Sequence, residues 1–278
     1  MITDIRLDGE QLTNGKRFCQ AIRNLNFPEV DWSSNKKGSF FGRNLSKEKI
    51  VSNRFAMEFQ VVGDDFSDIA DQRESFVEII SRVISDGEAL LEIDKSNGVK
   101  VQANVRGIDL SGDTNFADPL NAKMLVEFET ERPFLESQTL YEENGFIFQG
   151  GGTPVPMPIP LDMSVGGTNE LSLDVAGNYE AFPIFTFYGL LVNPSLYNAS
   201  TDKLFNLNLT LNSASDIVEV DTYYRVVRYL PSLGNARQYA SGDFWTLTNG
   251  INLIHLGSGN VNPYGKVKIT YRETFLGI

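Results

Sequence analysis

The chain has 278 residues, of which 36 are acidic and 24 are basic, so its formal charge at pH 7 is −12. This charge argues against a protein that grips nucleic acid by its phosphates, because such binding depends on clustered lysine and arginine. The negative charge is compatible with nucleic acid that passes through a conduit, since carboxylates repel DNA. The need for solubility alone would also account for this charge. The length predicts one large or two ordinary domains with a sizeable core.

The cysteine content and the hydropathy of the chain restrict the kind of protein further. Cys19 is the only cysteine, which excludes an intramolecular disulfide and a cysteine-based metal cluster. We interpret it as a packed or half-exposed thiol. The chain has no run of about 20 apolar residues, and its start lacks the basic-then-apolar order of a secretory signal. We therefore expect a protein that is made and used without crossing a membrane.

The first half is expected to combine strands with one helix. Residues 54–62 alternate apolar and polar side chains, the period-two pattern of a strand with one buried face. Apolar residues between Ile69 and Ile84 recur at three-and-four spacing, which predicts an amphipathic helix. Gly87 follows at the place where a left-handed helix cap is expected.

A hairpin and a further strand follow this helix. Residues 90–93 and 99–105 are predicted strands, joined through Asn97-Gly98, a dipeptide that tolerates positive φ in a tight turn. Residues 123–129 form the next predicted strand. Together these elements predict an α+β domain, a small sheet or split barrel with one helix on a face.

A change of composition separates the two halves. Residues 133–167 are rich in proline and glycine, with Gly150-Gly151-Gly152 and prolines at alternate positions from 154 to 160. Such a run suits sheet edges, turns or extended connectors, because proline removes a backbone donor. We place the boundary at residue 136, which gives predicted domains of residues 1–136 and 137–278.

The second domain is predicted to be all β. Residues 205–211 alternate apolar and polar side chains, and the predicted strands 216–221 and 223–229 follow closely, with turn residues between them. Short strands at this spacing, with no helical segment among them, predict a sandwich or jelly roll of antiparallel sheets.

Few residues suggest a reactive centre. His255 is the only histidine, without a cysteine or second histidine to share a zinc ion, and we interpret it as a core or rim residue. No Gly-x-Ser-x-Gly motif presents a nucleophile, and the glycine triplet at 150–152 is followed by neither the lysine nor the helix of a phosphate loop. We predict no enzyme, with no catalytic residue, no cofactor and no metal. A glycosidase-like pair of carboxylates stays open, because distance in the fold defines it.

An acidic cluster stands at the start of the predicted helix. It lacks the glycine and the terminal glutamate of an EF-hand loop, which argues against calcium. Negative charge near a helix N-terminus is favoured by capping and by the helix dipole, and explains the cluster better. Its members are Asp64, Asp65, Asp68 and Asp71.

Aromatic side chains of the second domain are the remaining candidates for a binding surface. Trp245, Tyr223 and Tyr239 are predicted contacts for a sugar or a protein partner, since aromatic rings offer an apolar face with a polar edge. Phe244-Trp245 precedes Leu247 in sequence, which also fits a plug of the core at the end of a strand. Both interpretations stay open.

The second half contains a series of short motifs: Pro183 with Phe185 and Gly189, Asn193-Pro194, Leu207 to Leu211, Asp221-Thr222 with Arg225 and Val227, Gly242-Asp243-Phe244-Trp245, Gly250-Ile251-Asn252, Tyr271-Arg272 and Leu276-Gly277-Ile278. Taken together in this order, the motifs resemble the distal tail protein (Dit) family of long, flexible-tailed bacteriophages. The first half is similar more loosely, with a glycine-bearing loop before Arg54, a helix led by Arg73 and a strand leading to Arg132-Pro133. It departs from the pattern in the lysine-rich loop expected at residues 32–53 and in the long proline-rich connector.

The resemblance implies a mainly β protein with a ring-forming N-terminal α+β domain and a C-terminal galectin-like antiparallel β-sandwich. It implies a structural component of a phage or prophage baseplate: a hexameric ring at the virion tail tip, assembled in the bacterial cytoplasm. The implied partners are further copies of the chain, the tail tube protein, a tail-associated hub or lysin protein and receptor-binding proteins, with DNA only in transit. The alternative is a carbohydrate-binding adhesin module of the tail tip, with host polysaccharide as its ligand.

Overall fold

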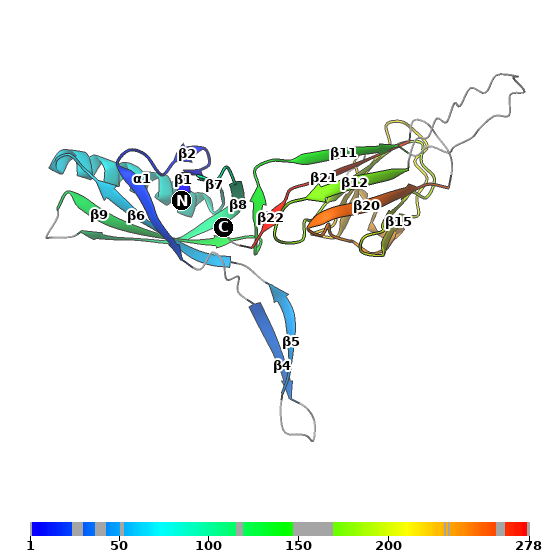
Figure 1. The fold of residues 1–278 in the computed structure, drawn as a ribbon, viewed down its shortest axis with the longest axis horizontal. Helices are drawn as coiled ribbons and strands as arrows, with labels where there is room; N and C mark the ends of the chain where they lie inside the picture. Colours follow the sequence, from blue (N-terminus) through cyan, green and yellow to red (C-terminus); the bar gives the residue numbers. More distant parts are fainter. Residues whose placement is uncertain are drawn as a thin grey trace, which may run out of the picture. The chain divides into compact units, whose positions relative to one another are not determined.

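The computed structural model describes residues 2–23, 30–36, 43–50, 53–114, 119–146, 169–230, 232, 234–259 and 265–276. Within these ranges the protein is mainly β, with antiparallel sheets and one α-helix, as predicted (Figure 1). The glycine triplet and the alternate prolines of the predicted connector lie outside the described residues.

Two compact units divide the chain. Unit 1 comprises Met1–Gln138 and Thr274–Ile278, and unit 2 comprises Thr139–Glu273. Residues from 274 onward therefore group with unit 1, whereas the predicted second domain ran to residue 278. The reason is a strand pairing, β10 (Leu135–Ser137) with β22 (Thr274–Phe275), which joins the segments that precede and follow unit 2 in the chain.

Unit 1 contains a nine-stranded sheet. Its main path follows the order β2-β1-β7-β8-β9-β6-β3, and β10 pairs with β8 and β22 beside that path. The strands are β1 (Ile2–Leu7), β2 (Glu10–Gln11), β3 (Arg17–Arg23), β6 (Asn53–Val62), β7 (Ala89–Lys95), β8 (Lys100–Thr114) and β9 (Asn121–Thr130).

The alternation in these strands sets which face is buried. In β6 the side chains of Phe55, Met57, Phe59 and Val61 are buried, while the residues between them are partly exposed. The β7–β8 hairpin turns at Gly98, whose φ of 83° is a value that glycine adopts at little cost. The predicted strand at 54–62, hairpin and strand at 123–129 are therefore confirmed.

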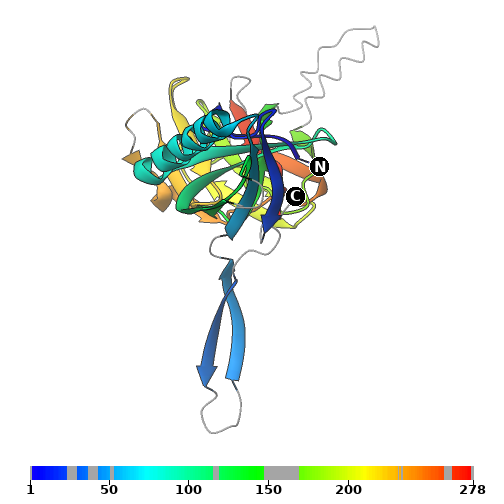
Figure 2. The ribbon, with the colours of Figure 1, turned by 90° about the vertical axis from the view of Figure 1, so that its left-hand side faces the viewer.

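The helix α1 (Phe66–Asp86) lies across one face of this sheet, and Figure 2 views unit 1 from another side. It turns an apolar stripe to the core: Ile69, Phe76, Ile79, Ile80 and Val83 are buried. Gly87 ends it with a φ of 88°, and its N–H donates to the Val83 carbonyl. The predicted helix and its left-handed cap are confirmed, with the helix about one turn longer than its apolar pattern.

A separate two-stranded sheet contains β4 (Val30–Lys36) and β5 (Arg43–Ile50). Its register runs from the pair Val30–Ile50 to the pair Lys36–Arg43. The lysine-rich sequence predicts a loop at residues 32–53, and the hairpin corrects that prediction. Residues 30–36 and 43–50 are mostly polar and lack a strict alternation of apolar and polar residues, which is the signal that predicts a strand.

Unit 2 is a sandwich of two sheets. The six-stranded sheet follows the order β11-β21-β13-β16-β17-β18, and the five-stranded sheet follows β12-β20-β14-β15-β19. The strands of the first are β11 (Tyr141–Phe146), β21 (Lys266–Tyr271), β13 (Ile184–Tyr188), β16 (Ile217–Asp221), β17 (Val226–Tyr229) and β18 (Gly234–Asn235). Those of the second are β12 (Glu170–Val175), β20 (Gly250–Gly257), β14 (Ser195–Asn198), β15 (Lys203–Leu207) and β19 (Ala240–Gly242).

Aromatic side chains from both sheets fill the core between them. Phe185 and Phe187 of β13 lie 5.9 and 6.3 Å from the ring of Phe205 on β15, measured between ring centroids. All three are fully buried. The predicted antiparallel sandwich follows from this packing of alternating inward side chains.

The strand predicted at residues 205–211 is shorter in the structure. β15 ends at Leu207, where the backbone N–H of Leu209 donates to the Leu207 carbonyl in a tight turn. Leu211 is nevertheless buried. The alternation of apolar residues thus continued beyond the strand, because a turn can also place every second side chain in the core.

Candidate assembly surfaces

Within the ranges that the structure describes, no group of three or more His, Cys, Asp and Glu side chains is placed to hold a metal ion. Nor does this part of the chain contain a helix with the length and apolar character needed to cross a bilayer. Exposed side chains, ion pairs and strand edges are therefore the candidate features for contact with other molecules.

His255 is a rim residue on the outer face of the five-stranded sheet. Its side chain is 44% exposed, and its Nδ1 lies 3.7 Å from a carboxylate oxygen of Glu170 on β12. On the other side its ring lies against Tyr197 of β14, with ring centroids 5.9 Å apart, and the Tyr197 hydroxyl donates to Asp202. These side chains form a polar and aromatic row across neighbouring strands, which suits contact with another molecule.

Trp245 is withdrawn from the candidate contacts, because the structure buries it completely. Its ring centroid lies 4.5 Å from that of Phe185, and its indole N–H donates to the Leu196 carbonyl at 3.3 Å. A side chain without exposed surface cannot stack on a sugar or a partner. The alternative interpretation, a plug of the core, describes its position.

Tyr223 and Tyr239 lie near the surface of unit 2. Tyr239 is 39% exposed at the end of η1 (Arg237–Tyr239), and its carbonyl accepts from the Asn208 N–H. Tyr223 is half-buried and meets Phe182 and Tyr224 edge-on, at 4.9 and 5.0 Å. Tyr224, another aromatic residue of the second half, is 48% exposed. Tyr223 and Tyr239 stay predictions, and with Trp245 buried the three residues do not share one exposed cleft.

The carboxylates of the acidic cluster at the start of α1 cap the helix and bind a neighbouring lysine. Asp65 caps the helix, since its Oδ1 accepts from the N–H groups of Ser67 and Asp68 at 2.9 Å. Asp64 and Asp68 hold the Lys16 ammonium at 2.6 and 2.7 Å. These hydrogen bonds raise the pKa of Lys16, and the donation from Lys16 holds the pKa of Asp68 below its usual range. Capping and ion pairing therefore account for three of the four carboxylates.

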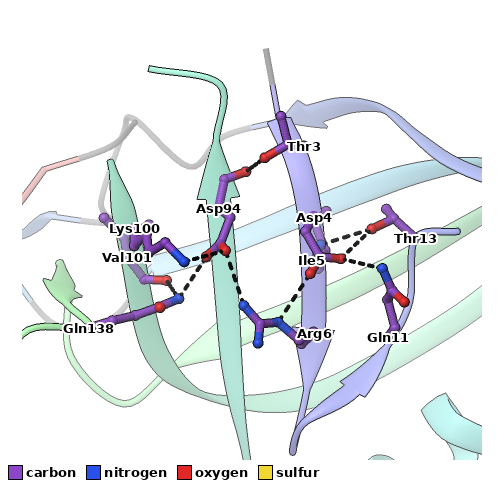
Figure 3. A network of polar contacts seen from close by, with 10 residues as sticks. All are labelled: Thr3, Asp4, Ile5, Arg6, Gln11, Thr13, Asp94, Lys100, Val101 and Gln138. Carbon is purple, nitrogen blue, oxygen red and sulfur yellow. Dashed lines mark hydrogen bonds and ion pairs between the residues drawn. The ribbon is translucent and has the colours of Figure 1, made fainter. Parts of the chain in front are cut away.

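A polar network connects strands β1, β2, β7 and β8 of unit 1 (Figure 3). The Asp94 carboxylate accepts from Arg6, Lys100 and Gln138, at 3.1, 3.0 and 3.1 Å. Partial burial acts to raise the pKa of Asp94, but donation from Lys100 and Gln138 outweighs it and the pKa is lowered. Arg6 also contacts Asp4 at 3.2 Å. Because three side chains already donate to the Asp94 carboxylate, the network holds the strands together and is poorly suited to binding a ligand.

Charged side chains alternate on the outer face of β3, β6 and β9. Glu58 accepts from Arg23 and lies 3.5 Å from the Lys123 ammonium, and the donation from Arg23 lowers the pKa of Glu58. Arg54 lies 3.5 Å from Glu129 on the same face. Because each of these cations has a carboxylate beside it, the face lacks the unpaired cluster of cations that phosphates require.

No protein-family model and no curated protein matches the chain. Among solved structures, the Dit protein of phage SPP1 is similar over 98% of each chain, with a TM-score of 0.61 and 13% sequence identity. The baseplate of phage P2, solved with calcium, matches over 96% of this chain and 97% of that one, with a TM-score of 0.43 and 14% identity. The chain thus has the fold of the SPP1 Dit protein, which confirms the predicted Dit-like architecture.

Proposed function

We propose that this chain is a structural protein of a phage tail tip, a distal tail component of the baseplate hub. The observation that carries the proposal is the fold that it shares with the SPP1 Dit protein, which belongs to the hub adsorption apparatus of phages that infect Gram-positive bacteria. The likeness extends over 98% of both chains.

The hub would be a ring of six copies that joins the tail tube to the tail-tip apparatus. A closed ring needs a heterologous interface, in which two different faces of the same subunit meet. Unit 1 offers suitable faces, because among the described residues its sheet ends in strands that pair on one side, and because it carries a mixed-charge outer face. Ring closure would cover those edges, which otherwise promote uncontrolled association.

Unit 2 would present surfaces to the other tail proteins. Apolar side chains stand exposed on the five-stranded sheet, with Ile251 67% and Leu204 41% exposed, and Tyr224 adds an aromatic surface. We propose protein partners for these surfaces: the tail tube protein, a tail-associated hub or lysin protein and receptor-binding proteins. The protein would act at the virion tail tip after assembly in the bacterial cytoplasm.

DNA would meet the ring only in transit. The net charge of −12 opposes tight contact with phosphates. On the outer face of β3, β6 and β9, the cations Arg23, Arg54 and Lys123 are paired with carboxylates. A channel built from such surfaces would let DNA slide without holding it. We assign no catalytic step to any residue.

The decisive experiment is size-exclusion chromatography with light scattering over a wide range of protein concentration, followed by negative-stain imaging of the peak. We expect a concentration-dependent shift from monomer to a species of six subunits, and six-fold rings in the images. A chain that stays monomeric at its highest soluble concentration, and that does not assemble when purified tail tube protein is added, contradicts the proposal.

A carbohydrate-binding adhesin is the alternative that the same experiment separates. With Trp245 buried, the sugar contacts would have to come from Tyr223 and Tyr239. An adhesin should be a monomer that binds cell-wall polysaccharide of the host and loses that binding in Tyr223→Ala or Tyr239→Ala. A structural hub should form rings whose assembly neither substitution changes.

A further inference from the structure

The two ends of the unit 1 sheet lie close together. The path of the sheet starts at β2 and β1 and finishes at β3, yet only residues 12–16 separate β2 from β3 in the chain. This connection is fixed by the Leu12 N–H, which donates to the Ile5 carbonyl at 2.8 Å, and by a bridge between Asn14 and Arg17. The sheet is therefore a barrel with an open seam.

The seam leaves one edge of β3 without a neighbouring strand. Among the described residues, β3 pairs along its length with β6 only, and its other edge takes part only in the Asn14–Arg17 bridge. Beside β1, the pairing with β2 covers Arg6 and Leu7, and Leu12 and Thr13 bond the carbonyl and N–H of Ile5, so among the described residues the edge is open only before Ile5. Unpaired N–H and C=O groups of this kind are a template for an added strand.

A cavity of about 880 Å³ opens at this seam, and we call it the seam groove. Its volume falls within the range of about 300–1,000 Å³ that is usual for ligand pockets. Phe18, which is 47% exposed, adds an apolar surface to it. The described residues that line the groove are Ile2, Thr3, Gln11, Thr13, Asn14, Gly15, Arg17 to Ile22 and Lys95.

The charge of the seam groove is opposite to that of the chain. Arg17 and Lys95 are the charged side chains among its described lining residues, although acidic residues outnumber basic ones by 36 to 24 overall. The groove is thus a cationic site on an acidic protein. Charge complementarity favours an occupant that carries carboxylates.

Arg17 provides an independent sign of a missing partner. The side chain is only 7% exposed, and its Nη2 donates to the Gln11 carbonyl at 3.3 Å. Its Nε and Nη1 are buried and have no acceptor among the residues that the structure describes. Burial lowers the pKa of Arg17, but a guanidinium stays charged in proteins. Buried donors of native proteins nearly always have partners, so an acceptor from outside the described chain is expected here.

We propose that the seam groove accepts an extended, carboxylate-bearing segment of a second copy of this chain, which adds to the free edge of β3 and supplies the acceptor for Arg17. The inference rests on the proposed ring, since a ring brings a second copy to each subunit. A carboxylate is the side-chain group that a guanidinium binds most strongly. Backbone pairing with β3 provides the rest of the contact without requiring a particular sequence.

Cys19 reports occupation of the groove without any substitution. Its thiol lines the seam groove and lies 3.7 Å from the Ala21 carbonyl. Burial raises the pKa of Cys19 to about 11, so alkylation with N-ethylmaleimide is best measured at alkaline pH. We expect the reaction to be about tenfold slower or more in assembled rings than in monomers at the same pH, because an added strand has to open before the reagent enters.

Two arginine substitutions test the charge. Arg17→Gln removes the buried guanidinium, whereas Arg228→Gln removes an exposed one from β17 of unit 2 and serves as the matched control. We expect Arg17→Gln to raise the concentration needed for assembly by about tenfold, and Arg228→Gln to leave it unchanged. Circular dichroism checks that both variants fold. If Arg17→Gln does not fold, the alkylation of the unsubstituted chain decides.

The outcomes separate this inference from the proposed ring. Rings in which Cys19 reacts as fast as in the monomer overturn the occupied groove and leave the ring intact. Monomers in which acetate alone protects Cys19 show a small-anion site and overturn the added strand. An unsubstituted chain that never assembles contradicts the ring and the inference together.

Discussion

Trp245 and Phe185 pack against each other in the core of unit 2, with ring centroids 4.5 Å apart and ring planes inclined at 48°. The contact joins the segment that follows β19 to β13 of the six-stranded sheet. The indole N–H is satisfied by the Leu196 carbonyl of β14. One side chain therefore links three segments of the sandwich, which makes it a structural anchor.

Trp245→Ala should destabilise unit 2 strongly. Removing a buried aromatic side chain typically costs about 3–5 kcal/mol, from lost burial and the cavity left behind. Tyr239→Ala is the control, because this partly exposed side chain should change stability by about 0.5 kcal/mol or less. Denaturant unfolding followed by far-ultraviolet circular dichroism measures both. Equal effects of the two substitutions would contradict the central position of Trp245.

Gly63→Ala should destabilise unit 1 through a backbone clash. A Cβ at Gly63 would lie 2.5 Å from both the backbone N and the Cβ of Ile69 in α1. Overpacking of this kind costs about 1–3 kcal/mol. A Cβ at the exposed Gly15 meets no atom within 4 Å, so Gly15→Ala should leave thermal stability unchanged or slightly raised. A Gly63→Ala protein as stable as Gly15→Ala would show that α1 does not approach β6 this closely.

Asp65→Ala should weaken the start of α1. Loss of a side chain that accepts from the N–H groups of Ser67 and Asp68 typically costs about 1 kcal/mol. Asp71→Ala removes the same charge from an exposed position within the helix and should cost less. Thermal unfolding of both variants, with and without added calcium, separates a cap from a metal site. A midpoint that rises with calcium and loses that rise in Asp65→Ala would favour the metal site.

The Asp216–Tyr229 contact should make unit 2 sensitive to acid. The Tyr229 hydroxyl donates to the Asp216 carboxylate at 2.5 Å, and the backbone N–H groups of Ser213 and Asn212 also donate to this carboxylate. These bonds hold the pKa of Asp216 below its usual range. Since an unfolded aspartate titrates near about 3.9, the contribution of Asp216 to stability is fully present above that pH. It is lost as the pH falls through the lower pKa of the folded state.

Asp216→Asn should therefore flatten the acidic limb of the stability curve. Thermal midpoints measured across the acidic range should fall less steeply with pH in Asp216→Asn than in the unsubstituted chain. Asp243→Asn, which removes an exposed carboxylate of the same unit, is the matched control and should keep the original slope. Parallel curves for all three proteins would mean that the Tyr229 contact does not form in solution.

Local sequence patterns were sufficient for the elements that carry their own signal. Period-two alternation identified β6, and three-and-four spacing with Gly87 identified α1 and its end. These signals work because a strand or helix with one buried face must repeat its apolar residues at its own geometric period. The Dit-like order of motifs led to the fold that the comparison confirms.

Candidate surfaces were predicted less well. Trp245 looked equally suited to a core and to a binding surface, since residues 244 and 245 lie outside any regular strand and no period indicates their direction. The seam groove gave no sequence signal at all. Arg17 is an ordinary arginine in the sequence, and that its Nε and Nη1 lack an acceptor within the described part of the chain appears only when the surrounding strands are in place.

The amino-acid sequence by itself determined the mainly β class, the single helix with its caps and the sandwich character of the second half, because these depend on neighbours within a few residues. Only the tertiary structure decided that β22 returns to β10, that Trp245 is enclosed and that β1 and β3 leave an open seam. These features depend on which distant strands pair and on how far a sheet curls. Pairing over long separations is set by the packing of the whole core, which no local period records.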